Sequence, residues 1–139
     1  MAATVSHLAD TMSVIRLTLH VLAACVWVGG QFVVAGLLPT VRTLGADAPR
    51  AVARAFGRLS WPAFWVLVAT GFWNYQAAGA HTTSAWRVAF SVKMVVVVLA
   101  GLASFLHTRA TTPARRGAFA GVAVLASTAA LVLGVALSG

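Results

Sequence analysis

The chain has 139 residues, of which 60% are hydrophobic and only 9% are charged, whereas soluble domains carry about 25% charged residues. This composition excludes an ordinary soluble domain, and the mean hydropathy of +0.91 is typical of an integral membrane protein. The formal net charge of +8 invites a nucleic-acid interpretation, which the positions of the basic residues exclude below.

A helix needs about 20 mostly apolar residues to cross roughly 30 Å of hydrocarbon. Four segments meet this requirement, and they leave no room for a separate soluble domain. We therefore predict one all-α membrane domain, an integral membrane four-helix bundle, with helices over about residues 14–38, 59–77, 86–106 and 117–137.

The first predicted helix carries an ionisable side chain, His20, inside its apolar run. Residues three, four and seven apart share a helix face, so Arg16, His20, Trp27 and Gln31 form one stripe, while Cys25 points elsewhere. Polar groups at membrane depth normally face the bundle interior or a cavity. Two interpretations stay open: His20 is a packing histidine hydrogen-bonded to a neighbouring helix, or it is a ligand.

A basic segment follows the first helix, which we expect to end at Pro39. Arg50, Arg54 and Arg58 recur every four residues, and this spacing predicts a short amphipathic helix over about residues 48–58 at the membrane surface. Anionic lipid attracts each basic residue near the surface by about 1 kcal/mol. We therefore expect this segment to bind anionic lipid.

Aromatic residues flank the second predicted helix. Trp61 lies near its start, Trp73 and Tyr75 near its end, and Trp86 opens the third helix. Because Trp and Tyr concentrate at membrane interfaces, these residues are expected to mark the two boundaries, with stacking on a cofactor as the alternative. His81, in the loop between these helices, is expected to be solvated.

The third predicted helix contains Lys93, an expensive side chain at membrane depth unless it is paired or reaches water. One interpretation is that the ammonium group snorkels to the nearer interface. The other follows from the parallel direction of the first and third helices, which places His20 and Lys93 at nearly the same depth. They would then share a polar pocket, whose roof is expected to contain Arg16, Arg87, Trp27 and Trp86.

Most basic residues fall in two loops, one between the first and second helices and one between the third and fourth: Arg42, Arg50, Arg54, Arg58, Arg109, Arg115 and Arg116. Lys and Arg in short loops accumulate on the cytoplasmic side. The excess charge is thus a topology signal, which places both termini on the outer, non-cytoplasmic side and argues against nucleic acid as a partner.

The fourth predicted helix has no ionisable side chain. Gly117 and Gly121 have the spacing of a small-residue packing face, which suits a homodimer or a larger membrane complex. His107, at the end of the third helix, lies roughly 21 Å along the axis from Lys93. It therefore cannot share one haem with His20.

Several short motifs occur together over about residues 16–110: His20 with Trp27-Val28-Gly29-Gly30, Phe56-Gly57-Arg58-Leu59-Ser60, Thr70-Gly71, and Trp86 with Lys93. In this order the chain resembles the copper-resistance protein D (CopD) family of four-helix membrane domains. The resemblance implies that the protein handles or moves copper at the cytoplasmic (plasma) membrane. A more distant resemblance to HemJ-type protoporphyrinogen oxidases implies haem b, with His20 as its ligand and Lys93 as an essential partner.

Three functions are therefore considered. The first is a CopD-like protein that binds copper or assists its passage. Cu(I) favours Cys, Met and His ligands, and His20 is the clear metal ligand, with Met12 and His7 in an N-terminal tail that can fold over the pocket. The second is a haem-b-binding redox protein, with Arg16 and Arg87 placed for the propionates. The third is a ligand-free accessory subunit of a larger membrane complex.

Overall fold

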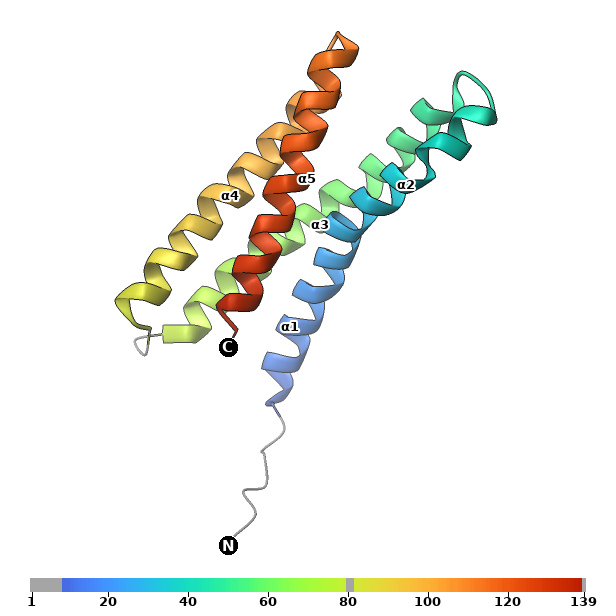
Figure 1. Ribbon diagram of the computed structural model, residues 1–139. Coiled ribbons are helices and arrows are strands. Elements are labelled where there is room, and N and C mark those ends of the chain that lie inside the picture. Colours follow the sequence, from blue (N-terminus) through green and yellow to red (C-terminus); the bar gives the residue numbers. More distant parts are fainter. Residues whose placement is uncertain (1–8, 80–81, 139) are drawn as a thin grey trace, which may run out of the picture.

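The computed structural model describes residues 9–79 and 82–138, and this part of the chain contains helices and short connections but no strand. Four helical rods follow one another along the chain (Figure 1). The first rod, Thr11–Thr43, is continuous and consists of an α-helix, a short π-helix and a second α-helix. The elements are α1 (Thr11–Ala24), the π-helix η1 (Cys25–Gly29), α2 (Gly30–Thr43), α3 (Ala48–Ala78), α4 (Ser84–Arg109) and α5 (Pro113–Ala136).

The first rod is longer at both ends than its apolar run predicts. It begins at Thr11 because Asp10 caps it, with the carboxylate accepting hydrogen bonds from the Ser13 hydroxyl at 2.7 Å and the Ser13 amide at 3.0 Å. These bonds hold the pKa of Asp10 below its usual value, the hydroxyl having the larger effect. The prediction that Pro39 ends the helix is wrong, since α2 continues to Thr43. Proline interrupts few backbone bonds, and long membrane helices tolerate it.

The predicted surface helix over residues 48–58 and the predicted span over 59–77 are one helix of 31 residues, α3. A separate amphipathic helix is therefore the wrong description, because no break separates the basic segment from the apolar one. Even Pro62 lies inside the helix. The helix ends at Gly79, whose φ of +58° is a left-handed conformation that glycine adopts without a Cβ penalty.

Three of the rods are long and apolar enough to cross a membrane: Thr11–Thr43, Ser84–Arg109 and Pro113–Ala136. The helix α3 is not among them, and its apolar half contains several polar residues. Two of these, Ser60 and Thr70, are each only 5% exposed. They therefore face the other helices and not the outside of the bundle.

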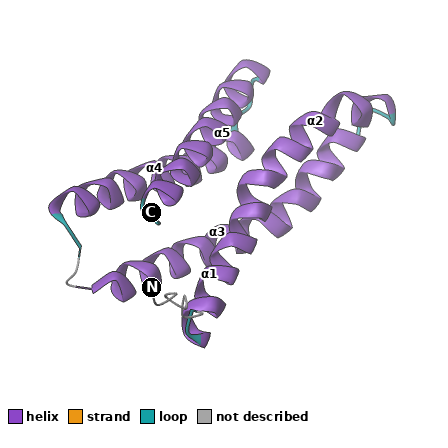
Figure 2. Ribbon diagram, turned by 60° about the horizontal axis from the view of Figure 1, so that its bottom comes forward, coloured by secondary structure: helices purple, strands orange, loops and turns teal. Residues whose placement is uncertain are grey.

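The rods form two antiparallel hairpins, one of α1–η1–α2 with α3 and the other of α4 with α5 (Figures 1 and 2). The π-helix η1 packs against α5 and joins the hairpins. Beside it, a core cluster of Trp27, Val28 and Phe64 is packed against side chains of α3 and α4. The centre of the bundle is thus built around the midpoint of the first rod.

The aromatic residues occupy two places. Trp61 packs in the core, with its ring centroid 5.7 Å from that of Trp27, instead of marking a boundary. At the end of the bundle where α3 ends and α4 begins, Tyr75, Phe90 and Trp86 stack, with Tyr75 and Phe90 centroids 4.7 Å apart. This second group lies where an interfacial belt is expected.

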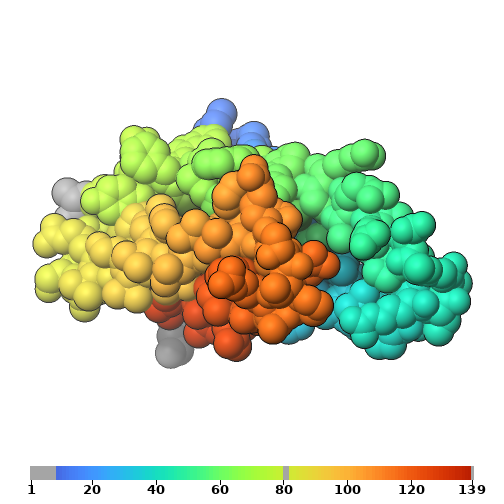
Figure 3. Space-filling view, turned by 90° about the horizontal axis from the view of Figure 1, so that it is seen from above, coloured from blue at the N-terminus to red at the C-terminus, as the bar shows by residue number. Residues whose placement is uncertain are grey.

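The connections α2–α3 and α4–α5 lie at the same end of the molecule, the upper end in Figure 1. Figure 3 looks onto this end, with the α2–α3 connection at one side and the α4–α5 connection nearer the centre. Seven basic residues gather here: Arg42, Arg50, Arg54, Arg58, Arg109, Arg115 and Arg116. The grouping of the two basic loops at one end, expected from the sequence, is therefore present.

Candidate functional site

His20, on α1, is half-buried and contacts α3. Its Nδ1 lies 2.7 Å from the Thr70 hydroxyl, and its Cε1 lies 3.7 Å from the place where a Cβ on Gly71 would stand. The small residue and the hydroxyl together let the imidazole approach α3 closely. The Thr70-Gly71 pair of the sequence motif is thus the surface on which His20 rests.

The hydrogen bonds of Thr70 fix which nitrogen of His20 carries the proton. The Thr70 hydroxyl lies 2.6 Å from the Val66 carbonyl oxygen, and that contact requires the hydroxyl proton because a carbonyl only accepts. The Thr70 oxygen then accepts from His20, whose Nδ1 is the donor. In a neutral imidazole with this tautomer, Nε2 carries the free lone pair.

Lys93 lies on α4, as far from the start of its helix in residues as His20 is from the start of α1. His20 is nine residues past the start of α1 and Lys93 nine residues past the start of α4, about 14 Å along each axis. The Lys93 ammonium lies 3.1 Å from where a Cβ on Gly134 of α5 would stand. His20 thus contacts α3, whereas Lys93 contacts α5.

The Lys93 ammonium lies near the C-terminal end of α5. Gly134 is two residues from the end of α5, so the ammonium reaches toward that end of the bundle, as a snorkelling lysine does. The partial negative charge at a helix C-terminus favours a cation there.

The four residues expected to roof the pocket lie in different surroundings. Arg16 lies one turn from His20 toward the start of α1, and its Nε is buried without a hydrogen-bond partner. Trp86 donates from its indole nitrogen to the Leu137 carbonyl at 3.2 Å, and Arg87 is exposed. Trp27 lies two turns deeper than His20 and is 4% exposed, in the core.

Trp27 belongs to a second buried polar cluster, which the sequence did not predict. Its indole nitrogen donates to the Ser127 hydroxyl oxygen at 3.0 Å, and the Gln31 amide donates to the same oxygen at 3.1 Å. Gln31 also donates to the Trp27 carbonyl at 2.9 Å. Ser127 is 2% exposed. The signals in the sequence were the shared helix face of Trp27 and Gln31 and a hydroxyl in the middle of an apolar helix.

The π-helix at Cys25–Gly29 was also missed. A π-helix adds about one residue per turn. In a helix that is apolar on all sides this addition does not change the hydropathy pattern, so the sequence does not reveal the π-helix. Gly29 and Gly30, which follow Trp27, were the available hint. Such segments are frequent at functional sites, and this one sets the depth at which Trp27 meets α5.

The side chains near His20 suit a copper ion and a haem iron to different degrees. Among the described residues, no group of three His, Cys, Asp or Glu side chains is placed to hold a metal ion. Cys25 is exposed, and Met94 lines an outward surface with Val95 and Val98. These residues do not form a closed copper site. A haem iron, which already has four nitrogen ligands, needs only an axial imidazole, and the buried Arg16 Nε suits an anionic propionate.

His7 and His81 lie outside the described residues. His107 lies at the opposite end of α4, where its Nδ1 donates to the Arg116 carbonyl at 2.9 Å. It is therefore a structural part of the α4–α5 connection.

Comparisons of the chain with protein-family models, with curated proteins and with solved structures found no match.

Proposed function

We propose that the chain is a multi-pass protein of the cytoplasmic membrane in which His20 binds copper as it passes through the bilayer, as the resemblance to the CopD family implies. The observation that carries this proposal is the hydrogen bond between His20 and Thr70. It directs the proton to Nδ1 and leaves Nε2 as the metal-binding atom. A ligating histidine typically donates its other N–H to such an acceptor.

In this proposal copper is cargo and not a resident cofactor. A single imidazole without further ligands binds an ion weakly and releases it readily, which suits passage better than storage. α3 is the fourth membrane-crossing helix, and the burial of Ser60 and Thr70 supports this because it hides their hydroxyls from lipid. The basic loops lie in the cytoplasm and both termini outside.

A second candidate, haem b, is favoured by the buried Arg16 Nε without a partner together with the lone imidazole. Haem would supply one-electron redox chemistry. His20 would be its axial ligand through Nε2, Thr70 would hold the imidazole orientation, and Arg16 would bind a propionate. The third alternative, a ligand-free accessory subunit, would use the Gly117 and Gly121 face to contact a partner.

One preparation tests these alternatives. The purified wild type is scanned for a Soret band and then loaded anaerobically with Cu(I), and bound copper is measured by metal analysis. We expect no Soret band and copper binding that approaches one ion per chain only at saturating Cu(I), and we expect this binding to be lost in His20→Ala but kept in His107→Ala, the matched control on α4. A Soret band lost in His20→Ala would support haem instead. A colourless preparation without copper, copurifying with a stoichiometric partner, would support the accessory subunit.

A further inference from the structure

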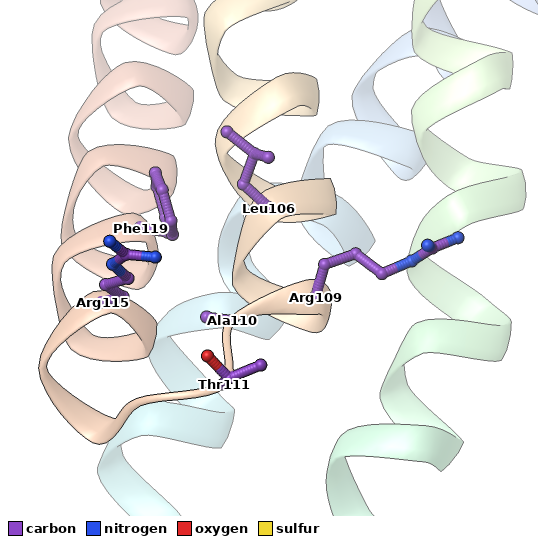
Figure 4. Close-up of a pocket in the computed structure, with 6 residues that line it drawn as sticks. All are labelled: Leu106, Arg109, Ala110, Thr111, Arg115 and Phe119. Atoms are coloured by element: carbon purple, nitrogen blue, oxygen red, sulfur yellow. The ribbon is translucent and has the colours of Figure 1, made fainter.

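A pocket of about 300 Å³ lies where α4 ends and α5 begins, far from His20. Six residues line it, as Figure 4 shows: Leu106, Arg109, Ala110, Thr111, Arg115 and Phe119. Its two sides differ in chemistry. Leu106 and Phe119 are half-buried and apolar, whereas Arg109, Thr111 and Arg115 are exposed and polar.

The two arginines take different positions. Arg115 projects from the first turn of α5, below Phe119, whereas Arg109 extends away from it toward α3 (Figure 4). The Arg109 guanidinium lies over the Phe105 ring, 4.9 Å from its centroid. Arg115 is therefore the guanidinium nearest the apolar side of the pocket, and Arg109 adds positive charge at the rim.

No acidic side chain competes for these arginines. The chain has two acidic residues, Asp10 and Asp47. Asp10 caps α1 at the other end of the bundle. Asp47, in the α2–α3 connection, lies 3.7 Å from Arg50. An anion at the pocket would thus meet positive charge without an internal carboxylate to displace.

The connection that forms the pocket is held in place by hydrogen bonds. The Arg116 guanidinium donates to the Ala110 carbonyl at 3.0 Å, and His107 donates to the Arg116 carbonyl at 2.9 Å. Thr112 caps α5 by accepting from the Arg115 amide at 3.3 Å. Little backbone ordering is then required when a ligand binds, which favours affinity.

The pocket also lies at the depth of lipid headgroups. α4 and α5 are both long and apolar enough to cross a membrane, and α5 has 24 residues, or about 36 Å, against roughly 30 Å of hydrocarbon. Arg115, in the first turn of α5, then reaches the headgroup region. Phe119, one turn further in, reaches the start of the acyl chains.

We propose that this pocket binds one anionic phospholipid, with Arg115 and Thr111 holding its phosphate and with Leu106 and Phe119 contacting the first part of an acyl chain. This site differs from the diffuse attraction of lipid expected at Arg50, Arg54 and Arg58. The pocket combines a cavity, a guanidinium and an apolar wall, and hydrogen bonds hold the connection that forms it in place. It is independent of any ligand at His20.

Native mass spectrometry of the full chain, released from detergent with added phosphatidylglycerol or phosphatidylcholine, tests the site. Wild type is expected to retain one phosphatidylglycerol in preference to phosphatidylcholine. Arg115→Gln is expected to weaken this binding about tenfold, since it removes a charge-assisted hydrogen bond. Arg42→Gln, which removes one exposed charge at the same end of the bundle, is the matched control and should bind as wild type does. Circular dichroism verifies that both variants fold.

The other outcomes each contradict the proposal. Equal weakening in Arg42→Gln would show diffuse attraction instead of a site. Unchanged binding in folded Arg115→Gln would exclude the pocket. Competition with inorganic phosphate separates the two sources of a phosphate group: displacement of the lipid by millimolar phosphate would identify a soluble anion as the ligand. Finally, Phe119→Ala should weaken lipid binding, and an unchanged affinity would remove the acyl-chain contact.

Discussion

Trp27 and Ser127, one hundred residues apart in the sequence, are joined by a hydrogen bond of 3.0 Å between the indole nitrogen and the serine oxygen. Both side chains are buried, with 4% and 2% of their surface exposed. The bond connects the π-helix in the first rod with α5 in the second hairpin. Together with the Gln31 amide, which donates to the same serine oxygen at 3.1 Å, it links the two hairpins at the middle of the bundle.

We predict that Ser127→Ala destabilises the protein by about 1–3 kcal/mol, because it leaves two buried donors, the Trp27 indole and the Gln31 amide, without their shared acceptor. The measurement is the midpoint of thermal unfolding in detergent, followed by circular dichroism. Thr128→Ala is the matched control. The Thr128 hydroxyl donates only to the Val124 carbonyl of its own helix, at 2.8 Å, so its loss should cost less. Equal losses in the two variants would show that the link between hairpins does not matter.

A second prediction concerns the support of His20 by Thr70. Thr70→Val keeps the shape of the side chain but removes the oxygen that accepts from Nδ1. Loss of such a support typically costs 10–100-fold in metal affinity, and we expect a decrease in that range for Cu(I) bound by the purified protein. Thr70→Ser retains a hydroxyl and should stay near the wild-type affinity. If Thr70→Val bound copper as wild type does, the hydrogen bond would have no role in metal binding.

A third prediction concerns Gly101, on which Phe64 packs. A Cβ at Gly101 would lie 2.7 Å from the Phe64 Cζ. Phe64 has no free space to move into because Trp27, Trp61 and Trp65 surround it, with the Trp27 centroid 4.7 Å away. Gly101→Ala should therefore destabilise the bundle by about 1–3 kcal/mol.

The control for Gly101 is Gly36→Ala, since nothing lies within 4 Å of a Cβ at Gly36. Alanine is also the better helix former. We expect this variant to unfold at or above the wild-type temperature. If the two alanine variants unfolded at the same temperature, the contact between Phe64 and α4 would not be tight.

The helices could be predicted from the sequence because long apolar runs allow few other structures in a membrane. The common depth of His20 and Lys93 stays a prediction, since it depends only on residue counts from the ends of two parallel helices. The helix ends were less predictable. Pro39 does not stop the first rod, and the basic segment at residues 48–58 continues directly into the apolar half of α3.

The partners of the polar residues could not be predicted, because they depend on the rotation of each helix. Thr70 and Ser127 are ordinary hydroxyl residues in the sequence, and only packing shows that one supports His20 and the other receives Trp27. For Trp61, the sequence pattern predicted the wrong location. A tryptophan near the start of an apolar run favours an interface, yet the length of α3 places this residue in the core.

The last prediction tests the orientation of the protein in the membrane. Basic loops favour the cytoplasmic side, so the end with the α4–α5 connection should lie inside. In a Cys25→Ser background, single cysteines are introduced by Ala85→Cys and Thr111→Cys, both at exposed positions and at opposite ends of the bundle. A membrane-impermeant maleimide added to intact cells should label position 85 only, and position 111 should become labelled after permeabilisation. A permeant maleimide serves as the control for reactivity at both positions. Labelling of position 111 from outside, without labelling of position 85, would invert the topology and place the opening of the His20 site toward the cytoplasm.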